Sequence, residues 1–308
     1  MFNNLIDIER LTSSEILSII DEAEGFKNGS LKPSLEGKTA ALMFFENSTR
    51  TKCSFDLAAQ RLGMNVLNFD TAHSSINKGE SLKDTLENLY FIGVDVAIIR
   101  HSMSGIIDNA IDVVKYPMSF VNAGDGNRAH PTQALLDFMT IREKRGNIEG
   151  KKIAIIGDIK HSRVAKSNLA LLNKFGADVH LCAPIYFRPE GFDQYNATWH
   201  LDLKSAIKDA DVVMMLRIQN ERLNGEMPDV QEYVKDYGLN SDILNKLAKP
   251  NAILMHPGPV NRNVEITSEL LDSERGKTIL EQAQNGVFVR MAVLNHILAA
   301  KKEVCFAS

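Results

Sequence analysis

Residues 40–52 read AALMFFENSTRTK. The apolar run at the start, Ala40–Phe45, predicts a buried strand, and Thr51–Leu62 predicts a helix that leads out of the stretch. Between them stand hydroxyl groups and the guanidinium of Arg50. A strand-to-helix turn with such donors, and with the unpaired N–H groups of a helix start, can bind an anion such as phosphate. The same residues also suit an ordinary helix cap with Arg50 in solvent, so this stretch alone leaves both interpretations open.

Strands and helices alternate through the rest of the chain in two series of similar length. The expected strands of the first series are 39–45, 66–69, 94–100 and 119–122, and those of the second are 152–156, 178–182, 212–216 and 252–256. This alternation predicts an α/β fold with two doubly wound domains, each with a central parallel sheet flanked by helices. We expect a first domain at 1–146, completed by a C-terminal helix within 287–308 that packs back on it, and a second domain at 147–286.

The composition argues against several classes of protein. Of the 308 residues, 44% are hydrophobic and 24% are charged, as in ordinary globular proteins, and the formal net charge of -4 does not suit a nucleic-acid-binding surface. The sequence shows neither an apolar run of the roughly 20 residues that span a membrane nor a secretory leader. Its three cysteines are scattered without metal-binding spacing, which predicts a reducing, cytoplasmic setting with no disulfide and no zinc site.

Polar and cationic residues gather where the expected strands end. In parallel sheets, ligands bind beyond the carboxyl ends of the strands. The six exits carry Arg50, Arg100, His130, Arg163, Arg217 and Arg262. If the two sheets face each other, these side chains would line a cleft that suits a phosphate and carboxylates. A surface salt bridge explains any one of the arginines as well, but their shared place at strand exits favours a binding cleft.

Two other classes of function stay open on this evidence. A strand at 153–157 followed by a helix is typical of a nicotinamide-binding turn, which would indicate a dehydrogenase. However, Gly157 is followed by Asp158-Ile159-Lys160, without the further glycines of that motif. A binding protein without catalysis is the second alternative, because a two-domain cleft alone shows only binding.

Several motifs, in this order along the chain, resemble the transcarbamylase family. They are Ser48-Thr49-Arg50-Thr51, Lys78-Gly79-Glu80-Ser81-Leu82 with the polar loop before it, His130-Pro131-Thr132-Gln133, Arg217-Ile218-Gln219-Asn220-Glu221-Arg222 and His256-Pro257-Gly258-Pro259. Each motif alone is weak, but the ordered set covers nearly the whole chain. Ornithine-specific members carry a cysteine after the late histidine and a Ser-Met-Gly loop. This sequence has neither, so the resemblance favours aspartate as the acceptor, with ornithine as the alternative.

The resemblance implies a reaction that joins carbamoyl phosphate to the α-amine of L-aspartate, giving N-carbamoyl-L-aspartate and phosphate, on the route to pyrimidines. It implies no cofactor and no metal. The implied ligands of carbamoyl phosphate are Ser48, Thr49, Arg50, Thr51, Arg100, His130, Gln133, Pro257 and Gly258, with Ser74 and Lys78 from an adjacent subunit. Catalysis is implied for Arg50, Thr51, Arg100 and His130. Aspartate binding is implied for Lys78, Arg163, Arg217 and Gln219.

The resemblance further implies a homotrimer with shared active sites. It also implies domain closure held by ion pairs from Glu46 to Arg163 and Arg222. Gly258 departs from the pattern, since better-known relatives carry a bulkier apolar residue there. The residues that follow, Val260-Asn261-Arg262, resemble bacterial chains that act without regulatory subunits, so we expect an unregulated homotrimer.

Overall fold

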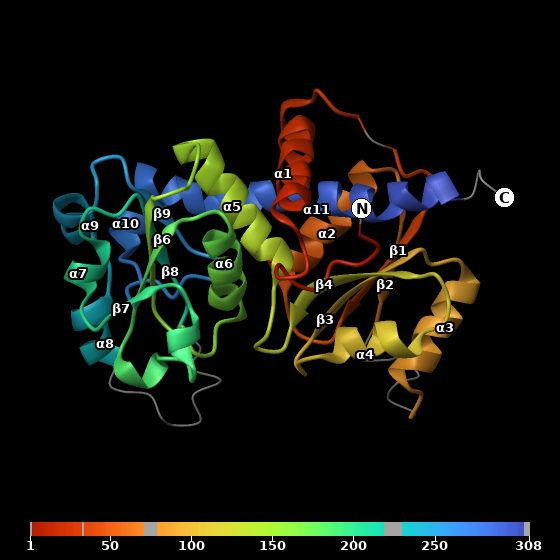
Figure 1. Ribbon diagram of the computed structural model, residues 1–308, viewed down its shortest axis with the longest axis horizontal. Coiled ribbons are helices and arrows are strands. Elements are labelled where there is room, and N and C mark those ends of the chain that lie inside the picture. Colours follow the sequence, from red (N-terminus) through yellow and green to blue (C-terminus); the bar gives the residue numbers. More distant parts are fainter. Residues whose placement is uncertain (1, 33, 71–78, 219–229, 305–308) are drawn as a thin grey trace. The chain divides into compact units, whose positions relative to one another are not determined.

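The computed structural model describes residues 2–32, 34–70, 79–218 and 230–304. The chain forms two compact units, one of Met1–Leu136 with Ala283–Ser308 and one of Asp137–Gln282 (Figure 1). The divisions fall inside two helices, α5 (Pro131–Arg145) and α11 (Lys277–Val304). The sequence had placed the boundaries later, at residues 146 and 286, because glycines and a change of pattern mark those positions whereas a continuous helix carries no boundary signal.

The first unit is built on a parallel sheet in the order β2-β1-β3-β4. Its strands are β1 (Thr39–Phe44), β2 (Asn65–Phe69), β3 (Val96–His101) and β4 (Ser119–Asp125). Its own helices are α1 (Ser13–Asn28), α2 (Thr49–Arg61), α3 (Leu82–Ile92) and α4 (Ile106–Val113). Helices α3 and α4 cover one face of the sheet, and α1 and α2 lie on the other side (Figure 1).

The central strands β1 and β3 are buried on both faces of this sheet, which explains their continuous apolar runs. On one face, Met43 of β1 and Ile99 of β3 join a core cluster with residues of α3 and α4. Leu42, which points to the opposite face, is fully buried as well, and so is Phe55 of α2. Helix α11 is tied to α1 by a hydrogen bond from Asn295 to a carboxylate of α1, so the C-terminal helix packs on the first unit as expected.

The second unit holds a parallel sheet in the order β7-β6-β5-β8-β9. Its strands are β5 (Lys152–Ile156), β6 (Asp178–Cys182), β7 (Thr198–His200), β8 (Val212–Met215) and β9 (Ile253–Met255). Its helices are α6 (Arg163–Lys174), α7 (Leu203–Ile207), α8 (Val230–Tyr237), α9 (Ser241–Leu247) and α10 (Ser268–Asp272). The expected fold class, two parallel sheets flanked by helices, is therefore confirmed.

Candidate active site

The turn between β1 and α2 has the form of an anion receptor. Ser48 is the N-cap residue of α2, and its carbonyl accepts the N–H of Lys52 at 3.1 Å. Within the described part of the chain, the Ser48 hydroxyl makes no capping hydrogen bond, which leaves it available to a ligand. Thr49 and Arg50 are exposed and Thr51 is buried. A helix N-terminus that carries hydroxyls and a guanidinium, and no acidic residue in its first turn, attracts phosphate.

Arg100 lies beside this turn because β1 and β3 are neighbouring parallel strands. Phe44 is paired with Arg100 in the sheet, and the N–H of the next residue, Phe45, donates to the carbonyl of Arg100 at 2.8 Å. The Arg100 guanidinium donates from Nη1 to the carbonyl of Ala123 at 3.2 Å, and its Nε lies 3.1 Å from a carboxylate oxygen of Glu46. This residue is therefore held at the mouth of the anion receptor, inside the first unit.

His130 and Gln133 stand at the start of α5. The carbonyl of His130 accepts the N–H groups of Gln133 at 3.0 Å and Ala134 at 3.3 Å, so His130 caps the helix with its main chain. Pro131 takes the first helical position, as its missing N–H favours. The side chains of His130 and Gln133 are both buried. Since β4, which leads to them, is the sheet neighbour of β3, the exits of β1, β3 and β4 lie along one edge and bring the predicted first-unit residues together.

In the second unit, Arg163 and Arg217 follow two neighbouring strands, β5 and β8. Arg163 opens α6 and is buried, while Arg217 is half-buried. Gly157, at the exit of β5, adopts a φ of +124°, and a Cβ there would lie 2.9 Å from the carbonyl oxygen of Leu216. The glycine thus lets the two exits approach each other, so the cationic residues predicted to bind aspartate leave the sheet at adjacent points.

The exit of β9 carries Pro257 and Gly258. Gly258 adopts a φ of +69°, in the left-handed region that favours glycine, and its N–H donates to Nδ1 of His256 at 2.7 Å. The departure from a bulkier residue at position 258 therefore matches the local backbone, and its main-chain carbonyl is still present for a ligand. The N–H of His256 in turn donates to the Gln282 side chain at 2.9 Å.

These features agree with comparisons to known proteins. Residues 3–143 match the family model described as the aspartate/ornithine carbamoyltransferase carbamoyl-P binding domain, and residues 149–297 match its Asp/Orn binding domain. The chain belongs to the aspartate/ornithine carbamoyltransferase family. Among its relatives, the aspartate carbamoyltransferase catalytic subunits of Syntrophotalea carbinolica and Flavobacterium psychrophilum are each 47% identical to it, over 97% of this chain and over 96% and 97% of theirs.

Solved carbamoyltransferases share the fold. The aspartate transcarbamoylase of Trypanosoma cruzi, in complex with carbamoyl aspartate and phosphate, has a TM-score of 0.85 and 32% identity, over 95% of this chain and 94% of that one. The ornithine carbamoyltransferase of Pyrococcus furiosus has a TM-score of 0.84 and 29% identity, over 95% and 96% of the two chains. The two scores are nearly equal, so the shape of the fold does not separate an aspartate enzyme from an ornithine enzyme.

Not every residue expected in a carbamoyltransferase site is described. Ser74, Lys78, Gln219 and Arg222 lie outside the described residues, so their roles stay predictions. Arg262, counted among the strand-exit arginines, is exposed and binds the carboxylate of Asp272 at 2.8 and 2.9 Å, as a surface ion pair does.

One residue that supports this carbamoyltransferase site was missed by sequence reasoning. Glu265 is fully buried and accepts the N–H of Ile218 at 2.9 Å, together with the N–H and the side-chain amide of Asn261 at 2.7 and 2.8 Å. It thus ties the exit of β8, which carries Arg217, to the exit of β9. Burial raises the pKa of the Glu265 carboxyl, against the effect of these hydrogen bonds. Glu265 and Ile218 are far apart in the sequence, so no local pattern predicts that they form a hydrogen bond.

Two other features, a membrane-spanning helix and a cluster of metal ligands, are absent from the part of the chain that the structure describes. No helix there is both long and apolar enough to cross a membrane. Nor do three or more His, Cys, Asp or Glu side chains of that part lie together as metal ligands would.

Proposed function

We propose that this protein transfers the carbamoyl group of carbamoyl phosphate to the α-amine of L-aspartate, giving N-carbamoyl-L-aspartate and phosphate. The observation that carries the proposal is the common edge of the first sheet, where a helix N-terminus with the residues Ser48–Thr51 stands beside Arg100 and His130. Aspartate is favoured over ornithine because relatives that are 47% identical to this chain are named aspartate carbamoyltransferase catalytic subunits.

The first unit would hold carbamoyl phosphate. Ser48, Thr49 and Arg50 would bind the phosphate through hydroxyl, guanidinium and main-chain N–H groups. Arg100, Thr51 and His130 would surround the carbonyl oxygen of the carbamoyl group, and Gln133 would accept the hydrogens of its amide. The carbonyls of Pro257 and Gly258 would share that task.

The second unit would hold aspartate. Arg163 and Arg217 follow adjacent strands and would bind the two carboxylates, with Gln219 beside them. When the amine attacks, negative charge develops on the carbonyl oxygen, and a donor aimed at it typically lowers the barrier by about 3 to 4 kcal/mol. The departing phosphate can accept the proton of the amine, so the chemistry requires no side-chain base. Much of the acceleration would come from holding two anionic reactants together against their repulsion.

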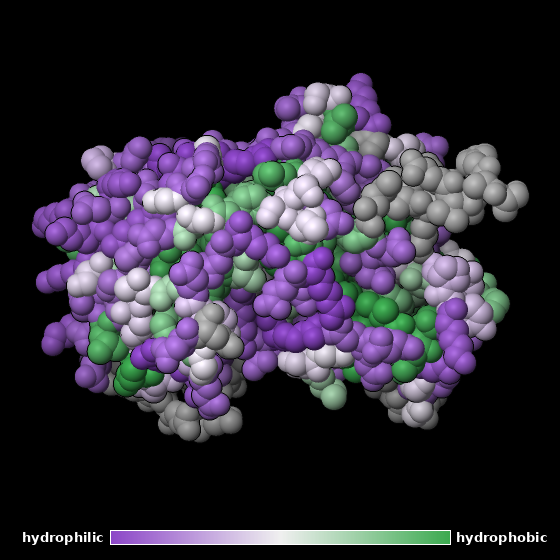
Figure 2. Space-filling view, viewed as in Figure 1, coloured by the Kyte–Doolittle hydropathy of each residue, from purple (hydrophilic) through white to green (hydrophobic). Residues whose placement is uncertain are grey.

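We further propose that the protein works as a homotrimer without regulatory subunits, with Ser74 and Lys78 reaching into the site of an adjacent copy. Figure 2 shows a mainly hydrophilic face on which hydrophobic side chains gather beside α3 and α4. At the end of α3, the helix that follows residues 71–78, Phe91 and Ile92 are 70% and 72% exposed. Phe91 also contacts Tyr116 edge-on, at 4.8 Å between ring centroids. An exposed apolar surface at the end of α3 supports contact with a second copy.

A ureido-product assay with either acceptor tests the reaction. We expect product from carbamoyl phosphate with aspartate and none with ornithine; product with ornithine alone would overturn the proposal. Saturable nicotinamide binding without product would favour the dehydrogenase, and substrate binding without turnover a binding protein. As a matched pair of variants, Arg50→Ala should abolish product, whereas Arg262→Ala should retain it because Arg262 is engaged with Asp272 at the surface.

Subunit sharing is tested by mixing two inactive chains. Arg50→Ala removes the phosphate ligand of a copy's own site, and Lys78→Ala removes the residue given to a neighbour. Mixed trimers of the two variants should regain activity because some sites then receive both residues intact. Absence of recovery after verified subunit exchange would show that Lys78 does not act across the interface. A role in cytoplasmic pyrimidine synthesis follows from the proposed product, and loss of the gene should then create a requirement for a pyrimidine.

A further inference from the structure

The loop between β4 and α5 is closed on itself and on its neighbours. Asp125, the last residue of β4, is fully buried. Its N–H donates to the carbonyl of Ala129 at 3.0 Å, while its own carbonyl accepts the N–H of Arg128 at 2.9 Å. Gly126 is pressed against the exit of β3, since a Cβ there would lie 2.7 Å from the backbone nitrogen of Ser104. The residue after this loop is His130, so the loop sets where that side chain stands.

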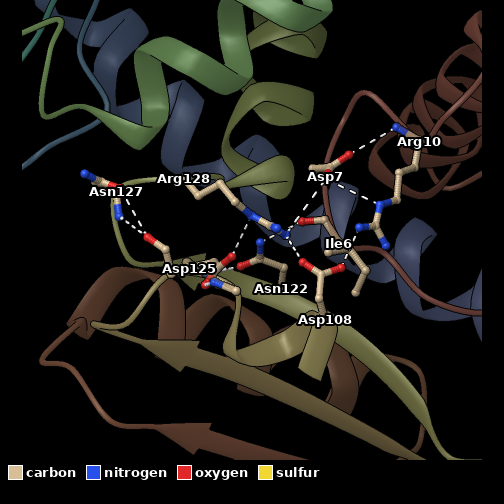
Figure 3. A network of polar contacts seen from close by, with 11 residues as sticks. Ile6, Asp7, Arg10, Asp108, Asn122, Asp125, Asn127 and Arg128 are labelled. Carbon is tan, nitrogen blue, oxygen red and sulfur yellow. Dashed lines mark hydrogen bonds and ion pairs between the residues drawn. The ribbon is translucent and has the colours of Figure 1, made fainter. Parts of the chain in front are cut away.

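Hydrogen bonds from the Gly126 N–H to the His101 carbonyl and between Asn127 and Ser104 join this loop to the exit of β3. The Arg128 guanidinium adds a link to the start of α4. Its Nε lies 2.9 Å from Oδ2 of Asp125, and its Nη2 forms an ion pair with Asp108, in the first turn of α4 (Figure 3). The other oxygen of the Asp125 carboxylate accepts the N–H of Gly105, the residue before α4, at 2.9 Å. One arginine thus joins the exit of β4 to the start of α4.

A second arginine extends the network outward. Arg10, whose side chain is 55% exposed, pairs with Asp7 and with Asp108 (Figure 3). The segment that carries Asp7 lies on the outer edge of β4, where the N–H of Leu5 donates to Phe120 and the carbonyl of Ile6 accepts the Asn122 amide at 2.7 Å. Arg10 therefore reaches Asp108 without touching the loop itself.

Stability alone gives a weak reason for such a network. Asp125 is fully buried while the Arg128 side chain is 37% exposed, so the carboxylate loses its water and the pair gains little net free energy. What the pair gives is a fixed geometry, since an uncompensated charge at Asp125 would be costly and Arg128 resists any movement of the loop that breaks the pair. The loop that receives this constraint is the one that ends at His130.

We propose that Arg128 is a positioning residue for the carbamoyl-transfer site. It fixes the main chain of residues 125–129, and through it the placement of the His130 imidazole and of Gln133 on the first turn of α5. The proposal rests on the proposed function, in which those two side chains meet the carbamoyl group. Displacing a catalytic group by about 1 Å can cost about 100-fold in rate, so a partial loosening of the loop should act on kcat.

A double-mutant cycle tests this. Arg128→Ala should lower kcat about 10-fold with the KM for aspartate within about three-fold of wild type, because the loss falls on a group that acts in the transition state. In a His130→Ala background the same change should lower kcat by less than about three-fold, because only Gln133 remains of the two groups that Arg128 positions. The matched control is Arg10→Ala, which removes an arginine from the same network and should leave kcat within about two-fold of wild type.

Three results would overturn the proposal: an unchanged kcat for Arg128→Ala, an equal loss in both backgrounds, or an equal loss for Arg10→Ala. If Arg128→Ala fails to fold, Arg128→Lys replaces it, since lysine keeps the charge but cannot span the carboxylates of Asp125 and Asp108 with one planar group. The NMR signal of the His130 imidazole gives a readout without turnover. This signal should move in the Arg128 variant and stay in place in Arg10→Ala. Because the measurement needs no turnover, it still tests the positioning role if the wild-type protein has no carbamoyl-transfer activity, a result that would refute the proposed function alone.

Discussion

The ion pair between Glu46 and Arg100 offers a direct test of how the first unit prepares its site. The Arg100 Nε lies 3.1 Å from the Glu46 carboxylate, and the two side chains are 13% and 18% exposed. Arg100 is also anchored by its Nη1 on the Ala123 carbonyl. Without the carboxylate, the guanidinium loses this ion pair while its hydrogen bond to Ala123 remains, and we expect it to rotate away from the carbonyl oxygen that it should stabilise. Glu46→Ala and the milder Glu46→Gln make that change.

The distance and burial set the size of the effect. Unit charges at 3.1 Å attract each other by about 5 kcal/mol at an effective dielectric constant of about 20, most of which is offset by lost hydration. For a pair that is largely but not fully buried, we expect Glu46→Ala to lower the free energy of unfolding by about 2 kcal/mol, or the melting temperature by about 4 to 8 °C. Partial loss of one oxyanion donor should lower kcat by about 10- to 100-fold.

Phosphate binding should respond much less. The hydroxyls and main-chain N–H groups of residues 48–51 belong to α2 and its cap, and Glu46 takes no part in that helix. Calorimetry should therefore give a dissociation constant for phosphate within about three-fold of wild type, while the ureido assay at saturating aspartate shows the fall in kcat. Lys38→Met is the control. It breaks a pair of 2.8 Å to Asp95, between the residues that precede β1 and β3, outside the proposed site, and should lower stability without changing kcat. An unchanged kcat in Glu46→Ala would refute the reasoning.

Three further predictions concern other parts of the chain. Burial lowers the pKa of His200, and the charges of His180 and Lys152 lower it further against the opposite effect of two aspartates. The unfolded chain therefore binds a proton more readily, and the free energy of unfolding should fall as the pH drops below about 6.5. Urea titrations at neutral and acid pH would detect this fall, and His200→Gln should flatten it. Glu265→Gln turns one acceptor oxygen of the buried carboxylate into a donor that faces a main-chain N–H. The free energy of unfolding should fall by about 1 to 3 kcal/mol. Because the segment at Ile218 is then held less firmly, the KM for aspartate should rise. Arg290→Met removes a buried guanidinium that lies 4.9 Å from the centre of the Phe55 ring. Calorimetric unfolding should show a free energy of unfolding lower by about 2 kcal/mol. An unchanged free energy of unfolding would mean that the methionine packs equally well.

The elements that sequence reasoning located are those with a long apolar signal. The strands expected at 152–156 and 178–182 coincide with β5 and β6. In β5 the buried residues Ile153–Ile156 form an apolar run, and in β6 the buried residues are Val179, Leu181 and Cys182. Strand β7 was missed. It spans only Thr198–His200 at the edge of its sheet, where a polar residue on either side of Trp199 gives no apolar run. Its pairing to β6 is a tertiary event, with no local pattern to reveal it.

In the candidate site, too, some residues could be predicted from the sequence and others could not. The residues expected to contact ligands sit at strand exits, and the topology of a parallel sheet brings exits together. Arg100 and His130 could therefore be placed from the order of elements alone. The groups that hold them in place could not. Glu46, Asp125 and Glu265 act through partners that the chain reaches only after folding, and a lone carboxylate in a sequence gives no sign of the partner it will meet.

One of these carboxylates, Glu46, counters a repulsion that occurs in any site for two anions. The cations of such a site repel one another until the substrates bind, and in the first unit Glu46 neutralises Arg100 in that interval. When carbamoyl phosphate brings its own negative charge to Arg100, the carboxylate of Glu46 is no longer needed to neutralise the guanidinium. The carboxylate is then repelled by the second anion. Substrate binding would then release Glu46 from its first partner.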